Sequence, residues 1–131
     1  MANRFNVVVP ETRDTKDSDA AAAHVKELAE KDYEKEVTAA PLPVVVDFYA
    51  ADSKPCETLF PRYAAVAGKY AGKVTFLKVL QASNAALAAK LGVTSAPTLV
   101  FFKGGKELGE RLTGEDIPRT AVKARVDALL A

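Results

Sequence analysis

The chain has 131 residues, of which 49% are hydrophobic and 27% are charged, as expected for one soluble globular domain. Its net charge is +1 and its Lys and Arg residues are interleaved with Asp and Glu, so we expect no nucleic-acid partner. The longest apolar runs are too short to cross a membrane, and the only cysteine, Cys56, has no partner for a disulfide within one chain.

Residues 1–22 are predicted to form an arm or linker ahead of a domain that spans residues 23–131. The stretch from Glu11 to Asp19 is polar and charged and lacks an apolar period. Phe5 to Val9 could add a short edge strand, but we expect a mobile tail there. No apolar signal-peptide core follows Arg4, so we expect a cytoplasmic protein, and the single cysteine agrees with this.

The first elements of the domain are a helix-favouring segment and a buried strand. The composition from Ala20 to Val37 favours helix, and its pattern alone permits one long helix. Val44–Tyr49 is a continuous apolar run with β-branched residues, which predicts a central strand covered on both faces. Asp47 lies within this run, where a carboxylate is costly unless it is paired.

A helix of about four turns is predicted to follow the tetrapeptide Ser53-Lys54-Pro55-Cys56 and to end at Gly72. Pro61 lies inside it, where it removes an internal hydrogen bond and kinks the axis. Four apolar residues recur at helical spacing and predict the buried stripe: Leu59, Tyr63, Val66 and Tyr70.

The remaining elements alternate between strand and helix. The pattern predicts a second central strand, an Ala-rich helix closed by Gly92, two strands joined by a Lys-Gly-Gly hairpin turn and a last helix from near Pro118. Their ranges are Lys73–Leu80, Asn84–Leu91, Thr98–Phe102 and Lys106–Leu112. This order predicts an α/β fold with a mostly parallel sheet, helices on both sides and a C-terminal antiparallel hairpin.

The strand Val44–Tyr49 leading into Ser53-Lys54-Pro55-Cys56 resembles the thioredoxin family, in which a strand delivers a Cys-Gly-Pro-Cys redox site to the start of a helix. The proline five residues after Cys56 and the segment Ser95–Thr98, similar to the family's cis-proline loop, extend the resemblance. It covers Val25 to the C-terminus and implies the thioredoxin fold, with a central mixed sheet flanked by helices. It also implies a strand near His24–Leu28 and a short helix at Glu30–Val37 in place of one long helix.

The resemblance implies that Ser53 and Cys56 occupy the positions of the two catalytic cysteines. The helix dipole contributes about 0.3–2 kcal/mol, enough to ionise a thiol but not an aliphatic hydroxyl. We therefore expect Ser53 to cap the helix rather than to attack a disulfide. Cys56 matches the resolving cysteine, where burial and acidic neighbours disfavour a thiolate. We favour an inert core residue, and slow intermolecular chemistry is the alternative.

Asp47 and Lys78 match a buried acid beneath the family's active site and the lysine that approaches it. In the family the aspartate helps to move the proton of the buried cysteine. Asp47 and Lys78 are therefore either catalytic residues of this chain or an ion pair inherited from a redox ancestor, and the sequence leaves both open.

The resemblance also implies a groove that binds an extended peptide through the backbone of Ala96. Asp52 stands where the family has a second tryptophan, and Lys54 replaces a glycine, so we expect a more charged groove than that of a general protein-disulfide reductase. The predicted substrate-binding residues are Tyr49, Asp52, Lys54, Pro55, Ala96, Pro97 and Gly114.

The sequence therefore predicts a thioredoxin-like protein with a degenerate SxxC site that binds a peptide or protein in the groove by Pro97. We expect a redox-inactive or redox-weak monomer without a membrane partner. The alternatives are an oxidoreductase of reduced scope with Cys56 as a monothiol, and an ordinary thioredoxin whose first cysteine was replaced. Asp52 and Lys54 argue against the latter. His24 is the only histidine, no cluster has metal-ligand spacing, and we expect neither a metal nor another cofactor.

Overall fold

The computed structural model describes residues 24–131, and the predicted arm, residues 1–22, with the possible strand Phe5–Val9, lies outside the described residues. The strands are β1 (Val25–Glu27), β2 (Val44–Tyr49), β3 (Thr75–Leu80), β4 (Thr98–Lys103), β5 (Lys106–Glu107) and β6 (Leu112–Thr113). The α-helices are α2 (Lys54–Lys69), α3 (Ala85–Leu91) and α4 (Arg119–Leu130). A 3₁₀ turn (Glu30–Asp32) and a π-helical segment (Glu34–Thr38) follow β1.

The strands form one mixed sheet in the order β1-β3-β2-β4-β5, with β6 also paired to β4. Strands β1 and β2 run parallel to β3, whereas β4 runs antiparallel to β2. The register places Asp47 of β2 opposite Lys78 of β3 and Leu99 of β4. The predicted α/β class and mixed sheet are confirmed.

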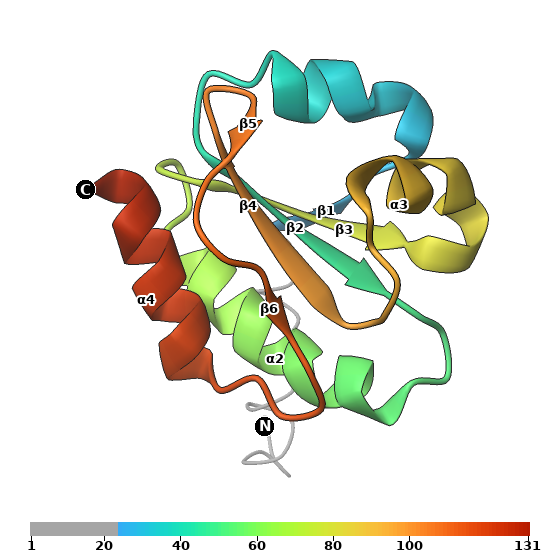
Figure 1. Ribbon diagram of the computed structural model, residues 1–131. Helices are drawn as coiled ribbons and strands as arrows, with labels where there is room; N and C mark the ends of the chain where they lie inside the picture. The colour runs from blue at the N-terminus through green and yellow to red at the C-terminus, as the bar shows by residue number, and fades with distance from the viewer. Residues whose placement is uncertain (1–23) are drawn as a thin grey trace, which may run out of the picture.

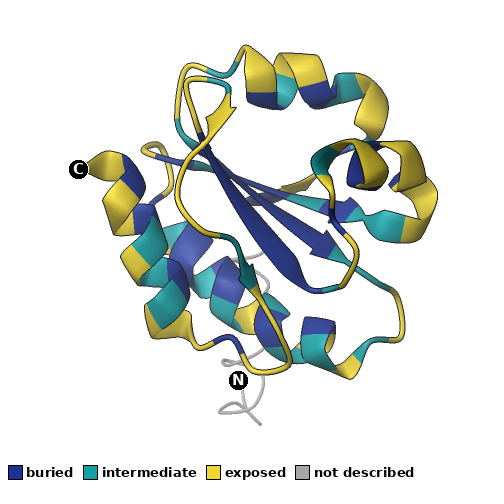
Figure 2. Cartoon of the chain, viewed as in Figure 1, coloured by how far each residue is buried: buried dark blue, intermediate teal, exposed yellow. Residues whose placement is uncertain are grey.

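Helices cover both faces of the sheet. Figure 1 shows α2 and α4 on one face of the sheet, and α3 with the helical residues 30–38 on the other. Strand β2 is buried at every position from Val44 to Phe48, and the central strands are dark blue in Figure 2. The continuous apolar run of β2 thus reflects contact with helices on both sides. Within residues 24–131 no helix combines the length and the hydrophobicity that crossing a membrane requires.

The buried stripe of α2 fixes this helix against the sheet. All four residues of the predicted stripe are buried, and Pro61 lies inside the helix. The Tyr63 hydroxyl donates hydrogen bonds to the carbonyl oxygens of Val45 (3.0 Å) and Leu77 (2.7 Å). Because these carbonyls belong to β2 and β3, the two bonds anchor the middle of α2 and thereby fix the position of Cys56 in its first turn.

The predicted strand Lys106–Leu112 is wrong as a single element. The chain pairs with β4 at Glu107, leaves the sheet and pairs again at Leu112. From Glu107 to Leu112 the chain advances five residues, while the partner strand advances three, from Phe102 to Leu99, so the two strands cannot stay in register. Gly109 has φ +80°, a left-handed conformation that an extended strand does not contain.

The helix predicted at Asn84–Leu91 is confirmed with a small shift of its start. A 3₁₀ turn at Gln81–Asn84 leads into α3, and the buried Asn84 is the N-cap residue. Gly92 ends the helix in the left-handed conformation (φ +71°), as the sequence predicts.

Candidate functional site

Ser53 joins β2 to α2 and caps the helix. Its backbone is extended (φ −106°, ψ 118°), and its Oγ accepts a hydrogen bond from the Cys56 N–H at 3.4 Å. Pro55 lies in the first turn of α2. Its missing backbone N–H costs no hydrogen bond there, because the N–H groups of the first turn have no acceptor within the helix. The predicted N-cap is confirmed, and the Ser53 hydroxyl oxygen is engaged in this structural hydrogen bond.

Cys56 lies in the first turn of α2 and is buried. The residue is 7% exposed, and its Sγ accepts a hydrogen bond from the Ala50 N–H at 3.4 Å. The sequence contains no second cysteine. The only sulfur nucleophile of this site is therefore a largely shielded thiol without an internal disulfide partner.

Asp47 lies in the middle of β2 with 2% of its surface exposed. Its Oδ1 has no hydrogen-bond partner among the described residues. The pKa of the Asp47 carboxyl is raised from 3.8 to about 7, chiefly by burial; the charge of Lys78 opposes this rise and that of Glu27 adds to it. The carboxyl can therefore change its protonation state near neutral pH.

Lys78 lies opposite Asp47 in the register, but its ion pair is with Glu27 of β1, at 3.9 Å. The Lys78 Nζ lies 5.5 Å from the ring centroid of Tyr49 and 4.9 Å from that of Phe60. Among the described residues, Lys78 and Asp47 do not approach within ion-pair distance. The lysine thus acts on Asp47 through its field rather than through a direct contact.

Tyr49 and Glu27 complete this group. The Tyr49 hydroxyl donates to both carboxylate oxygens of Glu27, at 2.9 and 3.1 Å. Partial burial and this hydrogen bond raise the pKa of Tyr49 to about 12. Sequence reasoning missed Glu27 because its proximity depends on the pairing of β1 with β3. It also missed Phe60, which lies four residues after Cys56 on α2, so helical spacing contained a signal for it.

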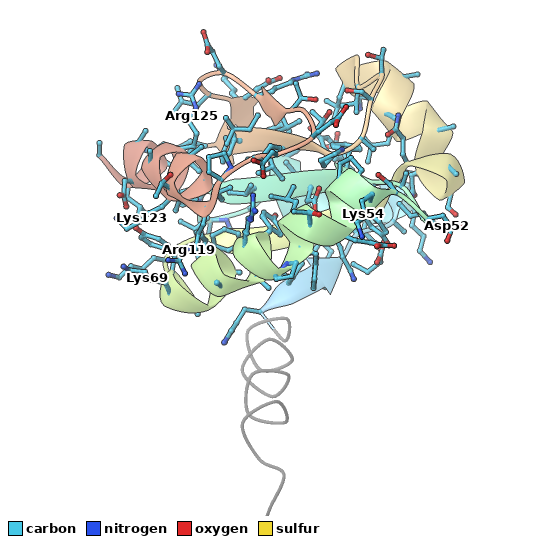
Figure 3. All side chains as sticks on the ribbon, turned by 90° about the horizontal axis from the view of Figure 1, so that it is seen from below. Asp52, Lys54, Lys69, Arg119, Lys123 and Arg125 are labelled. Carbon is cyan, nitrogen blue, oxygen red and sulfur yellow. The ribbon has the colours of Figure 1, made fainter. Side chains whose placement is uncertain are left out.

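Most of these side chains line one cavity of about 230 Å³. Asp52 and Glu57 are exposed on its rim, and Asp52 has φ +56°, a conformation that aspartate tolerates better than most residues. Five of the predicted site residues line the cavity: Asp47, Tyr49, Asp52, Cys56 and Lys78. Ser53, Lys54 and Pro55 do not line it. In Figure 3 the labelled Asp52 and Lys54 lie near the start of α2.

The other predicted residues belong to a separate loop cluster. The peptide bond between Ala96 and Pro97 is cis, and Gly114 follows β6 with φ +121°. The Thr113 hydroxyl donates to the Pro97 carbonyl oxygen at 3.1 Å and thereby ties the two segments together. Ala96, Pro97 and Gly114 do not line the cavity at Cys56. The predicted site residues therefore fall into three groups: five line the cavity, Ser53, Lys54 and Pro55 lie at the start of α2, and the other three belong to the loop cluster.

The chemistry open to this arrangement is limited. The Asp47 carboxyl, whose pKa is about 7, can exchange a proton with a bound molecule, and the Cys56 thiol can form a mixed disulfide with a second molecule. Within residues 24–131 no group of three or more His, Cys, Asp or Glu side chains is arranged to hold a metal ion.

Comparison with known proteins gives matches over most of the chain. A family model described as Thioredoxin matches residues 24–128. Thioredoxin X, chloroplastic, of Arabidopsis thaliana is 32% identical over 120 residues, which cover 91% of this chain and 65% of that protein. Thioredoxin 1 of Nostoc sp. is 32% identical over 82% of this chain and 96% of its own length.

Some relatives are longer than this chain. Protein disulfide-isomerase A3 of Gallus gallus is 37% identical over 78% of the chain, which corresponds to 19% of that protein. The chain spans 65% of the length of thioredoxin X and 60% of that of thioredoxin M4, chloroplastic, from Arabidopsis thaliana.

Proposed function

The chain belongs to the thioredoxin family, and we propose that it acts there as a peptide- or protein-binding module that does not carry out a dithiol redox cycle. The observation that carries this proposal is the pair of residues at the start of α2. Ser53 holds the N-cap position, and Cys56 is the only cysteine of the chain. A dithiol cycle requires two sulfur atoms, one to attack the substrate disulfide and one to resolve the mixed disulfide.

The loop before β4 supports binding of an extended peptide. The Thr98 hydroxyl donates to the Ser95 carbonyl oxygen at 2.8 Å, and Thr113 ties Pro97 to the strand beside it. A loop held in this way loses little conformational entropy when a ligand binds. In the proposed complex the backbone of Ala96 pairs with the peptide, as in other cases of strand addition.

An insulin-reduction assay with dithiothreitol tests the absence of dithiol turnover. We expect the wild type to stay at the background rate, with Cys56→Ser as the matched control. Ser53→Cys should restore measurable turnover, because the helix start would then contain both sulfur atoms. Turnover by the wild type well above the Cys56→Ser control would contradict the proposal.

A second experiment tests the groove. Carboxymethylated insulin B chain serves as an extended probe without a reactive thiol, and binding is followed by the change in its fluorescence anisotropy. Ala96→Glu places a larger charged side chain beside the proposed peptide path and should weaken binding. Ala86→Glu makes the same change at an exposed position of α3 and should not. Equal binding by the two variants would place the peptide elsewhere.

A monothiol oxidoreductase is the second candidate function. The observation that favours it is that Cys56 shares a cavity of about 230 Å³ with Asp47, whose pKa of about 7 lets it accept a proton. The Cys56 thiol would attack a low-molecular-weight disulfide, form one mixed disulfide and release one thiol. Incubation with glutathione disulfide and mass analysis would reveal this adduct on the wild type and not on Cys56→Ser.

A cytoplasmic location and a monomeric state are part of the same proposal. Three of the relatives are chloroplastic by name, and their location is not assumed for this chain. The single cysteine suits a reducing compartment. Size-exclusion chromatography with light scattering would test the monomer directly, and a molar mass near twice 14.0 kDa would contradict it.

A further inference from the structure

A second cavity, of about 220 Å³, lies between α2 and α4 and is separate from the Cys56 site. Three cationic side chains line it: Lys69 comes from the last turn of α2, and Arg119 and Lys123 come from α4. In Figure 3 these three labelled side chains lie near one another, at the end of α2 opposite Lys54.

The neighbours of this cluster neutralise only part of its charge, through Asp127, which pairs with Lys123 and also lies within the field of Lys69. Within residues 24–131, Lys69 and Arg119 take part in no ion pair, and Lys123 pairs with Asp127 at 3.0 Å. Asp116, which lies shortly before α4, is paired with Arg62 at 2.8 Å. The first turn of α4 contains no Asp or Glu that could compete for the cations. The cavity therefore has a net positive charge and space for an anion.

The donor set fits a tetrahedral oxyanion. The Arg119 guanidinium can bind two oxygens in a planar fork, while the two lysines supply compact charges and rotatable donors. The Thr120 hydroxyl, which also lines the cavity, can donate a further hydrogen bond. Donors from two helices can thus contact more than the two oxygens that a carboxylate offers. The cavity is smaller than the roughly 300–1,000 Å³ typical of drug-sized ligands, so it suits a small group.

We propose that this cleft between α2 and α4 binds a phosphate group, either as inorganic phosphate or as the phosphate of a monoester. The bound anion bridges the two helices that cover one face of the sheet. The site is independent of the peptide groove and of Cys56, so it does not depend on the function proposed above.

The test is an NMR titration of the ¹⁵N-labelled full chain with inorganic phosphate and, separately, with O-phosphoserine, at an ionic strength kept constant with NaCl. We expect saturable shifts of the backbone amides of residues 65–69 and 119–123. Lys69→Gln combined with Arg119→Gln should weaken binding by at least about tenfold, because it removes two charge-assisted donors. Lys31→Gln combined with Lys106→Gln removes the same charge at exposed positions elsewhere and should leave the affinity unchanged.

The two titrations also identify the source of the phosphate. Tighter binding of O-phosphoserine points to a monoester, and tighter binding of inorganic phosphate points to the free ion. Shifts that increase linearly without saturation, or an equal loss of affinity in the two double variants, would show general charge screening and overturn the proposal. Phosphate should also raise the melting temperature of the wild type more than that of the Lys69→Gln/Arg119→Gln variant. An equal rise in both would likewise overturn it.

Discussion

The buried Asp47 makes the stability of the folded protein depend on pH. Burial is the main reason that the carboxyl has a pKa of about 7 in the folded protein, instead of 3.8. Between these two values the unfolded chain releases the proton while the folded protein keeps it. The free energy of unfolding therefore falls as the pH rises through this range. Asp47→Asn should remove this dependence, because the amide is neutral at every pH.

The magnitude follows from the difference between the two pKa values. Roughly three pKa units at 1.36 kcal/mol per unit amount to about 4 kcal/mol. The wild type retains this stability below about pH 4, where the carboxyl is protonated in both states, and has lost it by about pH 8. An N–H of the new amide that is left without a partner costs about 1–3 kcal/mol, and this cost does not change with pH. Relative to the wild type, the variant should gain about 4 kcal/mol between these two pH values.

The measurement is urea unfolding of the wild type and of Asp47→Asn at a series of pH values between about 4 and 8. Glu115→Gln is the matched control, because this side chain is exposed and, within residues 24–131, takes part in no ion pair. The difference between the control and the wild type should vary little with pH. A constant difference between Asp47→Asn and the wild type across the series would refute the argument that burial raises the pKa of Asp47.

Three further predictions concern side chains of the site and the core. Native Cys56 should react with iodoacetamide far more slowly than the unfolded chain, because the residue is only 7% exposed; equal rates would show an open thiol. Ser53→Ala should lower the free energy of unfolding in urea by about 1 kcal/mol through loss of the N-cap, and an unchanged value would contradict that role. Tyr63→Phe should lower it by about 1–3 kcal/mol, since the hydroxyl donates to two buried carbonyls. Tyr33→Phe is the control, and an equal loss there would refute the assignment.

Local patterns in the sequence predicted the central sheet and its covering helices. The continuous apolar run Val44–Tyr49 indicates a strand buried on both faces, and the helical spacing of apolar residues in α2 indicates a helix buried on one face. The region before β2 has no comparable pattern, and its composition alone permits one long helix. A strand near His24–Leu28 was expected from the family resemblance, and the short β1 is found there. Its hydrogen bonds with β3 are contacts that no local pattern contains.

The site was predicted in part. Asp47 and Lys78 are neighbours in the register, as expected, but Lys78 forms its ion pair with Glu27. The sequence pattern also did not predict that the strand after the Lys-Gly-Gly turn divides into β5 and β6. Gly109 was compatible with either a strand or a break, and only the pairing of both ends of the segment with β4 decides between them.

The sequence by itself determined strand β2, helix α2 with its buried stripe, the N-cap at Ser53 and the presence of one sulfur atom, because each of these depends on residues close together in the chain. The tertiary structure decided which distant residues meet. Pairing of β1 with β3 brings Glu27 to Lys78, and packing of α2 over β2 encloses Asp47 and shifts its pKa. The contact between α2 and α4 likewise gathers Lys69 and Arg119 around one cavity. Burial and the field of neighbouring charges are sums over three-dimensional distances, and these distances exist only in the folded chain.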